Sequence, residues 1–365
     1  MTLYKNAYII TMEGENIENG YLLAENGKIK EIGNGEKEGN FEVVDLGGGY
    51  VCPGFVDAHS HIGLFGDGVP YSESDCNEKS EILTPHIRAL DGIDIMDNAF
   101  SEARKEGVTT VMAGPGSANP IAGTFAAVKT NGVRIDDAVI KADAAMKFAF
   151  GENPKKSHGD SLKTRMGIAA KIREALFDAK DKSDFKSTAL KKVLTGEMLC
   201  KAHAHRADDI FTALRIAKEF GLKISIDHCT EGHLIADKLK NENALFCVGP
   251  ILGDRGKCEL RNKSLETMLA FEKAGIDFAI ICDHPEVPQK DLRLCALVAA
   301  RAGLKKETAL RAITINAAKN CGIDDKVGSL KPGKDADFIV FDKHPMDFEA
   351  KVLTTYINGE KICNI

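Results

Sequence analysis

The chain of 365 residues has no tryptophan, no Cys-x-x-Cys pair and no apolar run long enough to span a lipid bilayer. Its N-terminal residues also lack the long apolar core of a secretory signal peptide, which argues against secretion. The ten cysteines are scattered, and the closest two are eleven positions apart. Such spacing is typical of buried free thiols in a reducing compartment, so we expect a cytoplasmic protein.

A long basic block is missing as well. The chain has 48 basic and 54 acidic residues and a net charge of −6, which argues against nucleic acid as a partner. Hydrophobic residues make up 44% and charged residues 28% of the sequence, a balance typical of folded globular proteins and not of disordered ones. We expect a homo-oligomer that acts on a small-molecule substrate, with no nucleic-acid or membrane partner.

Both ends of the chain are rich in short, strand-like runs. Residues 1–52 contain two alternating runs joined by Asn26-Gly27, and a second Asn-Gly pair stands at 358–359. An Asn-Gly pair between alternating runs is a strong hairpin signal. Neither end has enough strands to be stable alone. We therefore predict one small β-sandwich domain formed by both termini, residues 1–52 and 327–365.

Residues 53–326 alternate apolar, strand-like runs with amphipathic helical patterns. One helical pattern covers 207–220, where Ile210 and Leu214 share a face and Gly221 ends the helix. Eight strand-like runs, mostly separated by helices, predict an α/β fold of the (β/α)₈ TIM-barrel type, and a doubly wound open sheet is the competing architecture. The runs are GFVDAHSH, GVTTVMAG, GTFAAVKT, AAMKFAFG, EMLCKAHAH, LKISIDH, ALFCVG and DFAIICD.

Histidine and aspartate gather at the C-terminal ends of these runs. In a barrel those ends share one rim, where active sites are built. Each His-x-His pair has both imidazoles on one face of its strand, because side chains alternate with period two. Burying these imidazoles without a metal or polar partners would cost free energy at each one. We predict that six side chains converge on one metal-binding cavity: His59, His61, His203, His205, His228 and Asp283.

Other catalytic signatures are absent or incomplete. The chain has no Gly-x-Ser-x-Gly elbow and no phosphate-binding P-loop. Residues 114–119 follow a strand but have Asn119 where a dinucleotide-binding fingerprint needs its third glycine. The isolated histidines are interpreted as ordinary hydrogen-bonded polar groups: His86, His158 and His344.

Several segments resemble the metal-dependent amidohydrolase superfamily. PGFVDAHSH is similar to the first-strand signature of that superfamily, and GSLKPGKDAD is similar to its C-terminal motif. The segments between them resemble imidazolonepropionase-like and prolidase-like members: VTTVMAGPGSANPIAGTFAAVKTNG, GENPK, KAHAHRADDI, IDHCTEGH and CDHPEVP. The resemblance covers nearly the whole chain. It implies a distorted (β/α)₈ barrel with a small β-domain made from both chain ends.

The resemblance also implies a ligand set. Its metal ligands match His59 and His61 on the first strand, His203 on the fifth, His228 on the sixth and Asp283 on the eighth. His205 lies one step further out on the same face as His203. It would therefore be a substrate-facing or supporting group.

Two further polar residues are candidates for substrate binding. Arg206 directly follows the second His-x-His pair and would clamp a substrate carboxylate in bidentate fashion. The alternative for Arg206 is an ordinary salt bridge to Asp208 or Asp209. Asn119 lies in a predicted rim loop, with solvated surface as its alternative.

The implied cofactor is one or two divalent ions, Zn²⁺ first, with Mn²⁺, Co²⁺ or Fe²⁺ as alternatives. Such an ion would lower the pKa of a water molecule, and Asp283 would act as the general base that accepts the proton of that water. The ion or His205 would polarise the substrate carbonyl. This chemistry predicts hydrolysis of a cyclic amide, an N-acyl amino acid or a small dipeptide. The alternatives are a deaminase of an amino-heterocycle and a non-catalytic binding or assembly protein.

The fourth strand decides how a second ion would be held. Relatives with two ions use either a carboxylated lysine on this strand or a glutamate in its place. Lys147 is the only lysine in AAMKFAFG, and Glu152 follows that run directly. Measured from Glu152, Lys147 lies five residues down the strand, or roughly 16 Å, which predicts that it is too deep to reach the rim. We therefore predict that Glu152 bridges two metals, with capping of the next helix as the alternative.

Overall fold

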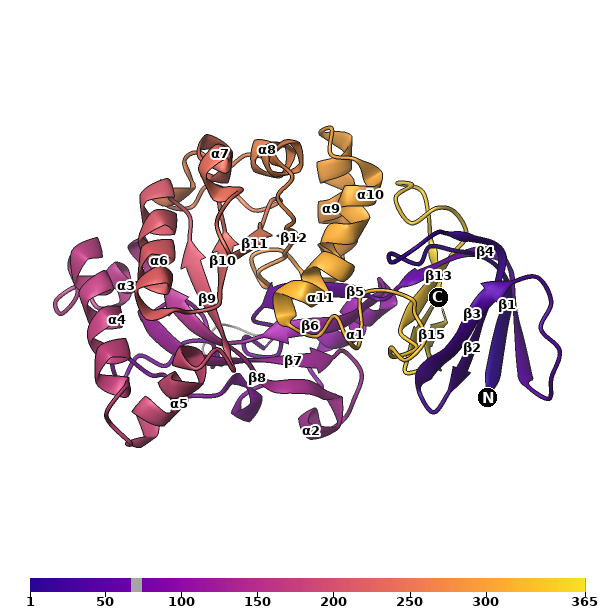
Figure 1. Ribbon diagram of the computed structural model, residues 1–365, viewed down its shortest axis with the longest axis horizontal. Coiled ribbons are helices and arrows are strands. Elements are labelled where there is room, and N and C mark those ends of the chain that lie inside the picture. The colour runs from indigo at the N-terminus through magenta and orange to yellow at the C-terminus, as the bar shows by residue number, and fades with distance from the viewer. Residues whose placement is uncertain (67–73, 365) are drawn as a thin grey trace.

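The computed structural model describes residues 1–66 and 74–364, which form two sheets with helices around the larger one (Figure 1). The larger sheet has eight strands in the order β12-β11-β10-β9-β8-β7-β6-β5. Its strands are β5 (Phe55–Ser60), β6 (Val108–Ala113), β7 (Ile121–Lys129), β8 (Val139–Ala149), β9 (Leu199–Ala204), β10 (Ile224–His228), β11 (Leu245–Val248) and β12 (Ala279–Ile280).

The two edges of this sheet meet. The backbone N–H of Asp283 donates to the carbonyl of His59 (3.2 Å), and the N–H of His61 donates to the carbonyl of His284 (3.1 Å). These bonds join the chain just beyond β12 to β5, so the sheet is a nearly closed barrel. Every predicted run overlaps one of its strands, which confirms the barrel prediction and excludes the open-sheet alternative.

One strand departs from the expected parallel arrangement. β7 runs antiparallel to both β6 and β8, whereas β5 pairs with β6, and β8 with β9, in parallel. The reason is the length of the connections. Only residues 114–120 join β6 to β7, and only 130–138 join β7 to β8, whereas a parallel crossover needs about a dozen residues or more. The chain therefore turns back on itself twice here.

Helices cover the outside of the barrel (Figure 1). In α6, Ile210, Leu214 and Ala217 are buried, and Gly221 ends the helix in the left-handed conformation at φ 70°, as predicted. No helix in the described ranges is long and apolar enough to cross a membrane. The helices are α1 (Asn98–Lys105), α2 (Ile135–Ala138), α3 (Glu152–Ser157), α4 (Arg165–Ala179), α5 (Phe185–Leu194), α6 (Ala207–Phe220), α7 (Ala236–Leu239), α8 (Glu266–Ala274), α9 (Leu292–Arg301), α10 (Lys306–Ala312) and α11 (Ile315–Cys321).

The second sheet contains strands from both ends of the chain, in the order β15-β14-β13-β4-β1-β2-β3 (Figure 1). Both predicted Asn-Gly hairpins are present, with Asn26, Gly27, Asn358 and Gly359 all at positive φ. The two-layer sandwich stays a prediction. The strands are β1 (Thr2–Ile9), β2 (Ile17–Glu25), β3 (Lys28–Asn34), β4 (Glu42–Pro53), β13 (Phe338–Phe341), β14 (Val352–Ile357) and β15 (Glu360–Asn364).

Candidate metal centre

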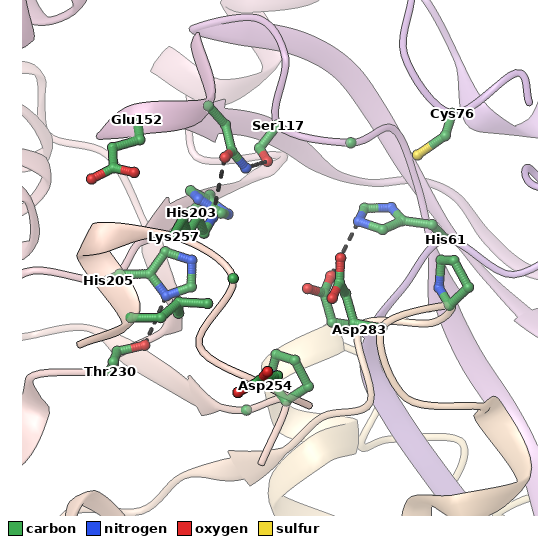
Figure 2. Close-up of a pocket in the computed structure, with 18 of the residues that line it drawn as sticks. His61, Cys76, Ser117, Glu152, His203, His205, Thr230, Asp254, Lys257 and Asp283 are labelled. Atoms are coloured by element: carbon green, nitrogen blue, oxygen red, sulfur yellow. Dashed lines mark hydrogen bonds and ion pairs between the residues drawn. The ribbon is translucent and has the colours of Figure 1, made fainter. Parts of the chain in front are cut away.

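The six predicted side chains meet at the C-terminal ends of the barrel strands. Figure 2 shows four of them, His61, His203, His205 and Asp283, around one cavity of about 470 Å³. The five histidines of the set are at most 8% exposed. The carboxylate of Asp283 is 14% exposed and faces this cavity.

One half of the centre is built around Asp283. Its Oδ1 lies 3.3 Å from His59 Nε2 and 3.2 Å from His61 Nε2. The residue has φ 54°, a left-handed conformation that is uncommon for aspartate. Such strain persists only where the surrounding structure enforces it, and it is frequent at functional sites. Here the carboxylate is turned toward both imidazoles of β5.

The other half is a cluster of three imidazoles. The ring centroids of His203, His205 and His228 lie 4.5–4.6 Å apart. Nε2 of His203 and Nε2 of His228 are buried and have no hydrogen-bond partner within the described residues. His228 ends β10 at φ 75°, which breaks the strand alternation and lets Asp227 and His228 both face the barrel interior. Buried, unpaired imidazole nitrogens are the donor atoms that a divalent metal requires.

The outer nitrogens of these rings are held by protein groups. Nδ1 of His61 lies 2.6 Å from the carbonyl of Gly114, and Nδ1 of His228 lies 2.8 Å from the carbonyl of Gly249. A carbonyl can only accept, so each Nδ1 carries a proton, and the unpaired Nε2 of His228 keeps its lone pair. Metal-ligating histidines are usually oriented in this way.

Burial sets the charge of the three clustered rings. It lowers the pKa of His228 to about 3 and holds the pKa values of His203 and His205 well below the usual range. These rings are therefore neutral at pH 7, the form that binds metal. Burial would raise the pKa of Asp283, but His228, His59 and His61 hold it well below its usual range. The carboxylate is thus ionised beside the neutral ring of His228, and it is one of the groups that raise the pKa of His61 to about 10.

Lys147 corrects the prediction for the fourth strand. Its Nζ lies 3.3 Å from His59 Nε2, so the side chain reaches the centre that it was predicted to miss. The strand ends at Ala149, which is in register with His203, and Lys147 is only two residues below that level. The predicted depth was too large because Glu152 already belongs to α3. Burial lowers the pKa of Lys147 to about 8.

Glu152 lines the cavity but stands apart from Asp283 and His61 (Figure 2). It is the first residue of α3, but the N-cap is Gly151 and no side chain forms a capping hydrogen bond there. The backbone N–H of Glu152 donates to the Glu259 carboxylate (2.9 Å). Among the described residues, the groups of side chains with ligand atoms close enough to share an ion do not include Glu152. The bridging role of Glu152 stays a prediction.

A buried ion pair behind His59 escaped the sequence analysis. Asp227 Oδ2 lies 2.9 Å from His59 Nδ1, and Lys201 Nζ donates to Asp227 Oδ1 (2.6 Å). Both side chains of the pair are fully buried. Period-two alternation along β9 places Lys201 on the face of His203 and His205, so a charged residue in this apolar run was the available signal.

Glu259 also escaped the sequence analysis. It lies in the loop between β11 and α8, and its carboxylate is fully buried. Its Oε1 is 3.8 Å from Nε2 of both His203 and His205 and 2.8 Å from Lys257 Nζ. The residue sits in no strand and no His-x-His pair, so the local sequence contains no signal for it.

The two predicted substrate-binding residues are engaged elsewhere. Arg206 forms a bidentate pair with Asp208 (2.9 and 2.7 Å), the alternative that the sequence left open, and it is absent from the cavity lining. Asn119 is 1% exposed, and its amide group contacts Thr84, His158 and the carbonyl of Glu78. The polar groups of Arg206 and Asn119 therefore bind neighbouring parts of the chain. A polar residue at the rim can stabilise its own loop as readily as it can bind a ligand.

The chain was compared with known families and proteins. The model of the amidohydrolase family matches residues 50–362. A solved amidohydrolase from Thermotoga maritima MSB8 is 39% identical, each chain covers 100% of the other, and the TM-score is 0.97.

Curated relatives give a wider picture. The amidohydrolase tasK of Hapsidospora irregularis is 26% identical over 93% of this chain, but the chain spans only 39% of that relative. The imidazolonepropionase of Fusobacterium nucleatum subsp. nucleatum is 24% identical over 93% of this chain and 89% of the relative. A 5-methylthioadenosine/S-adenosylhomocysteine deaminase of Bacillus thuringiensis is 46% identical over 66 residues, which are 17% of this chain and 15% of that protein.

Proposed function

This chain belongs to the amidohydrolase family, and we propose that it is a metal-dependent hydrolase that cleaves an amide-type C–N bond in a small molecule. The observation that carries the proposal is the convergence of five buried histidines and one ionised aspartate on one centre, from which His61, His203, His205 and Asp283 face the cavity. The unpaired Nε2 atoms of His203 and His228 fit a divalent metal, because buried imidazole nitrogens are among its usual ligands.

Each side chain has a defined task in this reaction. A divalent ion held by the histidines and Asp283 would supply the acidity that turns a water molecule into a nucleophile at neutral pH. Asp283 accepts the proton of that water, because its low pKa keeps it ionised and its carboxylate faces the cavity. His205, which lies in the same cavity, then orients the substrate carbonyl.

We also assign the bridging role on the fourth strand to Lys147 in place of Glu152. The reach of Lys147 Nζ to His59 supports this assignment. A neutral amine reacts with carbon dioxide to form a carbamate and release one proton. The lowered pKa of Lys147 increases the fraction of neutral amine at pH 7 to 8. The resulting carboxylate would extend toward both halves of the centre.

The proposed substrates are cyclic amides, N-acyl amino acids and small dipeptides. The cavity lining fits compact polar molecules, because its described residues combine lysines with acidic side chains and include one phenylalanine. A deaminase of an amino-heterocycle is the second candidate. It is favoured by the 46% identity to the Bacillus thuringiensis deaminase, although that match covers only 17% of this chain.

A substrate screen tests the proposal. The Zn²⁺, Mn²⁺ and Co²⁺ forms of the purified chain are incubated with the three amide classes and, separately, with aminopurines and aminopyrimidines. Cleavage of an amide bond that is lost in Asp283→Asn supports the proposal. Ammonia release from the heterocycles alone would favour the deaminase. A metal-loaded chain that turns over none of them would favour a binding or assembly protein.

A further inference from the structure

We propose that Lys263 binds a carboxylate group of the substrate, so that the chain selects amides that carry a carboxylate. The inference rests on the proposed function, because Lys263 lines the same cavity as Asp283. It names a group that N-acyl amino acids and small dipeptides share and that uncharged amides and aminoheterocycles lack. Arg206, for which the sequence suggested this role, pairs with Asp208 and is absent from the cavity lining.

Three lysines line the cavity within the described residues, and they differ in their partners. Lys257 Nζ lies 2.8 Å from the carboxylate of Glu259, and Lys156 is exposed to solvent. Lys263 Nζ instead donates to the carbonyl of Gly253 (2.6 Å). An ammonium has three donors, so Lys263 keeps two of them for a ligand.

The ammonium of Lys263 is only partly hydrated. The side chain is half-buried, and burial lowers its pKa below the usual range, whereas the carboxylates of Glu286 and Asp254 act in the opposite sense. A desolvated charge is unfavourable unless an opposite charge lies close to it. A substrate carboxylate at Nζ would supply that charge through a charge-assisted hydrogen bond, which is roughly twice as strong as a neutral one.

Two acidic side chains near Lys263 do not take its remaining donors. Glu286 and Asp254 line the same cavity, but within the part of the chain that the structure describes no carboxylate oxygen lies within 4.0 Å of Lys263 Nζ. Asp254 instead accepts the backbone N–H of Arg255 (2.7 Å), and Arg255 Nη2 donates to the carbonyl of Lys263 (2.7 Å). The loop thus holds the backbone of Lys263 and leaves its ammonium for a ligand.

Lys263 lies next to the turn that follows the proposed base. The backbone N–H of Glu286 donates to the carbonyl of Asp283 (2.9 Å), which folds residues 283–286 into a tight turn. A Cβ added to Gly253 would lie 3.4 Å from Lys263 Nζ and 3.7 Å from the carbonyl oxygen of Glu286. The ammonium is therefore close to the segment that carries the catalytic carboxylate. A substrate whose amide group lies at Asp283 would place a neighbouring carboxylate toward Lys263.

Binding of matched ligand pairs tests the assignment. The Zn²⁺-loaded chain is titrated with N-acetylglycine, N-acetylalanine and N-acetylleucine, each beside its carboxamide, by ligand-observed NMR, which also reports any hydrolysis. At least one carboxylate should bind about tenfold or more tightly than its carboxamide, the ratio that one charge-assisted hydrogen bond provides. Lys263→Met and Lys263→Gln should each abolish this preference, and Lys263→Arg should keep most of it, because the guanidinium restores the charge.

Lys156→Met is the matched control, because Lys156 lines the same cavity and is exposed. It should keep the preference for the carboxylates. An equal loss in Lys156→Met and Lys263→Met would mean that general positive charge is responsible, and it would overturn the proposal. A preference that persists in Lys263→Met or Lys263→Gln would place the carboxylate on the metal instead and would overturn it too, as would a wild-type chain that prefers no carboxylate.

Binding requires no turnover, so the assignment of Lys263 and the proposed function fail separately. A chain that binds carboxylates through Lys263 but hydrolyses no amide would count against the proposed function alone. A chain that hydrolyses amides without any preference for a carboxylate would count against the assignment of Lys263 alone.

Discussion

The two halves of the centre differ in how their polar atoms are satisfied. Around Asp283, the carboxylate lies within 3.3 Å of Nε2 of both His59 and His61, and Lys147 Nζ is also 3.3 Å from His59. In the other half, Nε2 of His203 and of His228 have no hydrogen-bond partner in the part of the chain that the structure describes. A buried polar atom without a partner costs about 1–3 kcal/mol. The first half is complete within the protein, and the second has free nitrogens that a bound cation would satisfy.

The largest effect is expected when Asp283, the base in the half that is complete within the protein, is removed. Asp283→Asn should lower the turnover number by about 10²–10⁴, because an amide cannot accept the proton of the attacking water. Steady-state kinetics on the substrate found in the screen measures this loss. His284→Asn is the control, because His284 is absent from the cavity lining and its Nδ1 accepts the N–H of Gln289. Equal turnover in wild type and Asp283→Asn would show that another group is the base.

The second prediction concerns the Lys201–Asp227 ion pair behind His59. It distinguishes the effect of this pair on stability from its effect on metal binding. Asp227→Asn and Lys201→Met should each lower the free energy of unfolding by about 3–5 kcal/mol, because each leaves one buried charge without its partner. The double variant should recover most of that loss in urea unfolding. It should nevertheless bind the ion next to His59, His61 and Asp283 about 10–100-fold more weakly. The reason is that His59 Nδ1 has lost its carboxylate partner. Wild-type affinity in the double variant would limit Asp227 to a structural role.

The third prediction compares the two candidates on the fourth strand. Lys147→Ala should lose the second ion and most of the activity, and short carboxylic acids should restore both by occupying the space of the carbamate. Glu152→Ala should keep the wild-type metal stoichiometry, because its contacts belong to the start of α3. Metal counting on both variants measures the difference. Loss of an ion in Glu152→Ala alone would reinstate Glu152 as the bridge.

The smallest effect is a pH dependence of the metal-stripped chain. Burial lowers the pKa of His228 from 6.5 to about 3, so between these values the unfolded chain binds a proton that the folded chain does not. Stability must therefore fall as the pH falls from about 7 toward 3. For His228 alone the loss between pH 7 and 5.5 is about 1 kcal/mol. His228→Gln should reduce the loss in urea unfolding by that amount. An unchanged slope would mean that the ring is protonated in the folded chain.

The polar side chains at the strand ends of the barrel could be predicted from the sequence, because period-two alternation and the His-x-His spacing are local patterns. The same reasoning misjudged Lys147, since its depth depends on where β8 ends and on the register of Ala149 with His203. It also missed Glu259, whose position depends on a loop that packs against residues more than 50 positions earlier. Contacts set by register and by loop packing are not local, so sequence pattern alone could not supply them.

The antiparallel strand β7 shows the same difference between local and non-local information. Its existence was predicted from GTFAAVKT, but its direction depends on the connections before and after it. Between the predicted runs the sequence has residues 115–122 and 131–143, so only the first connection is too short for a parallel crossover. The length of that first connection would have given the direction of β7 as well as its position.

Metal analysis of the His59→Ala/His61→Ala double variant tests the central claim most directly. The wild-type chain should be purified with one or two divalent ions per chain and should hydrolyse the substrate found in the screen. In the double variant, metal and activity should disappear together while the circular dichroism spectrum stays that of the folded chain, because the complete half of the centre has lost both its imidazoles. Full metal content in a folded double variant would contradict the account.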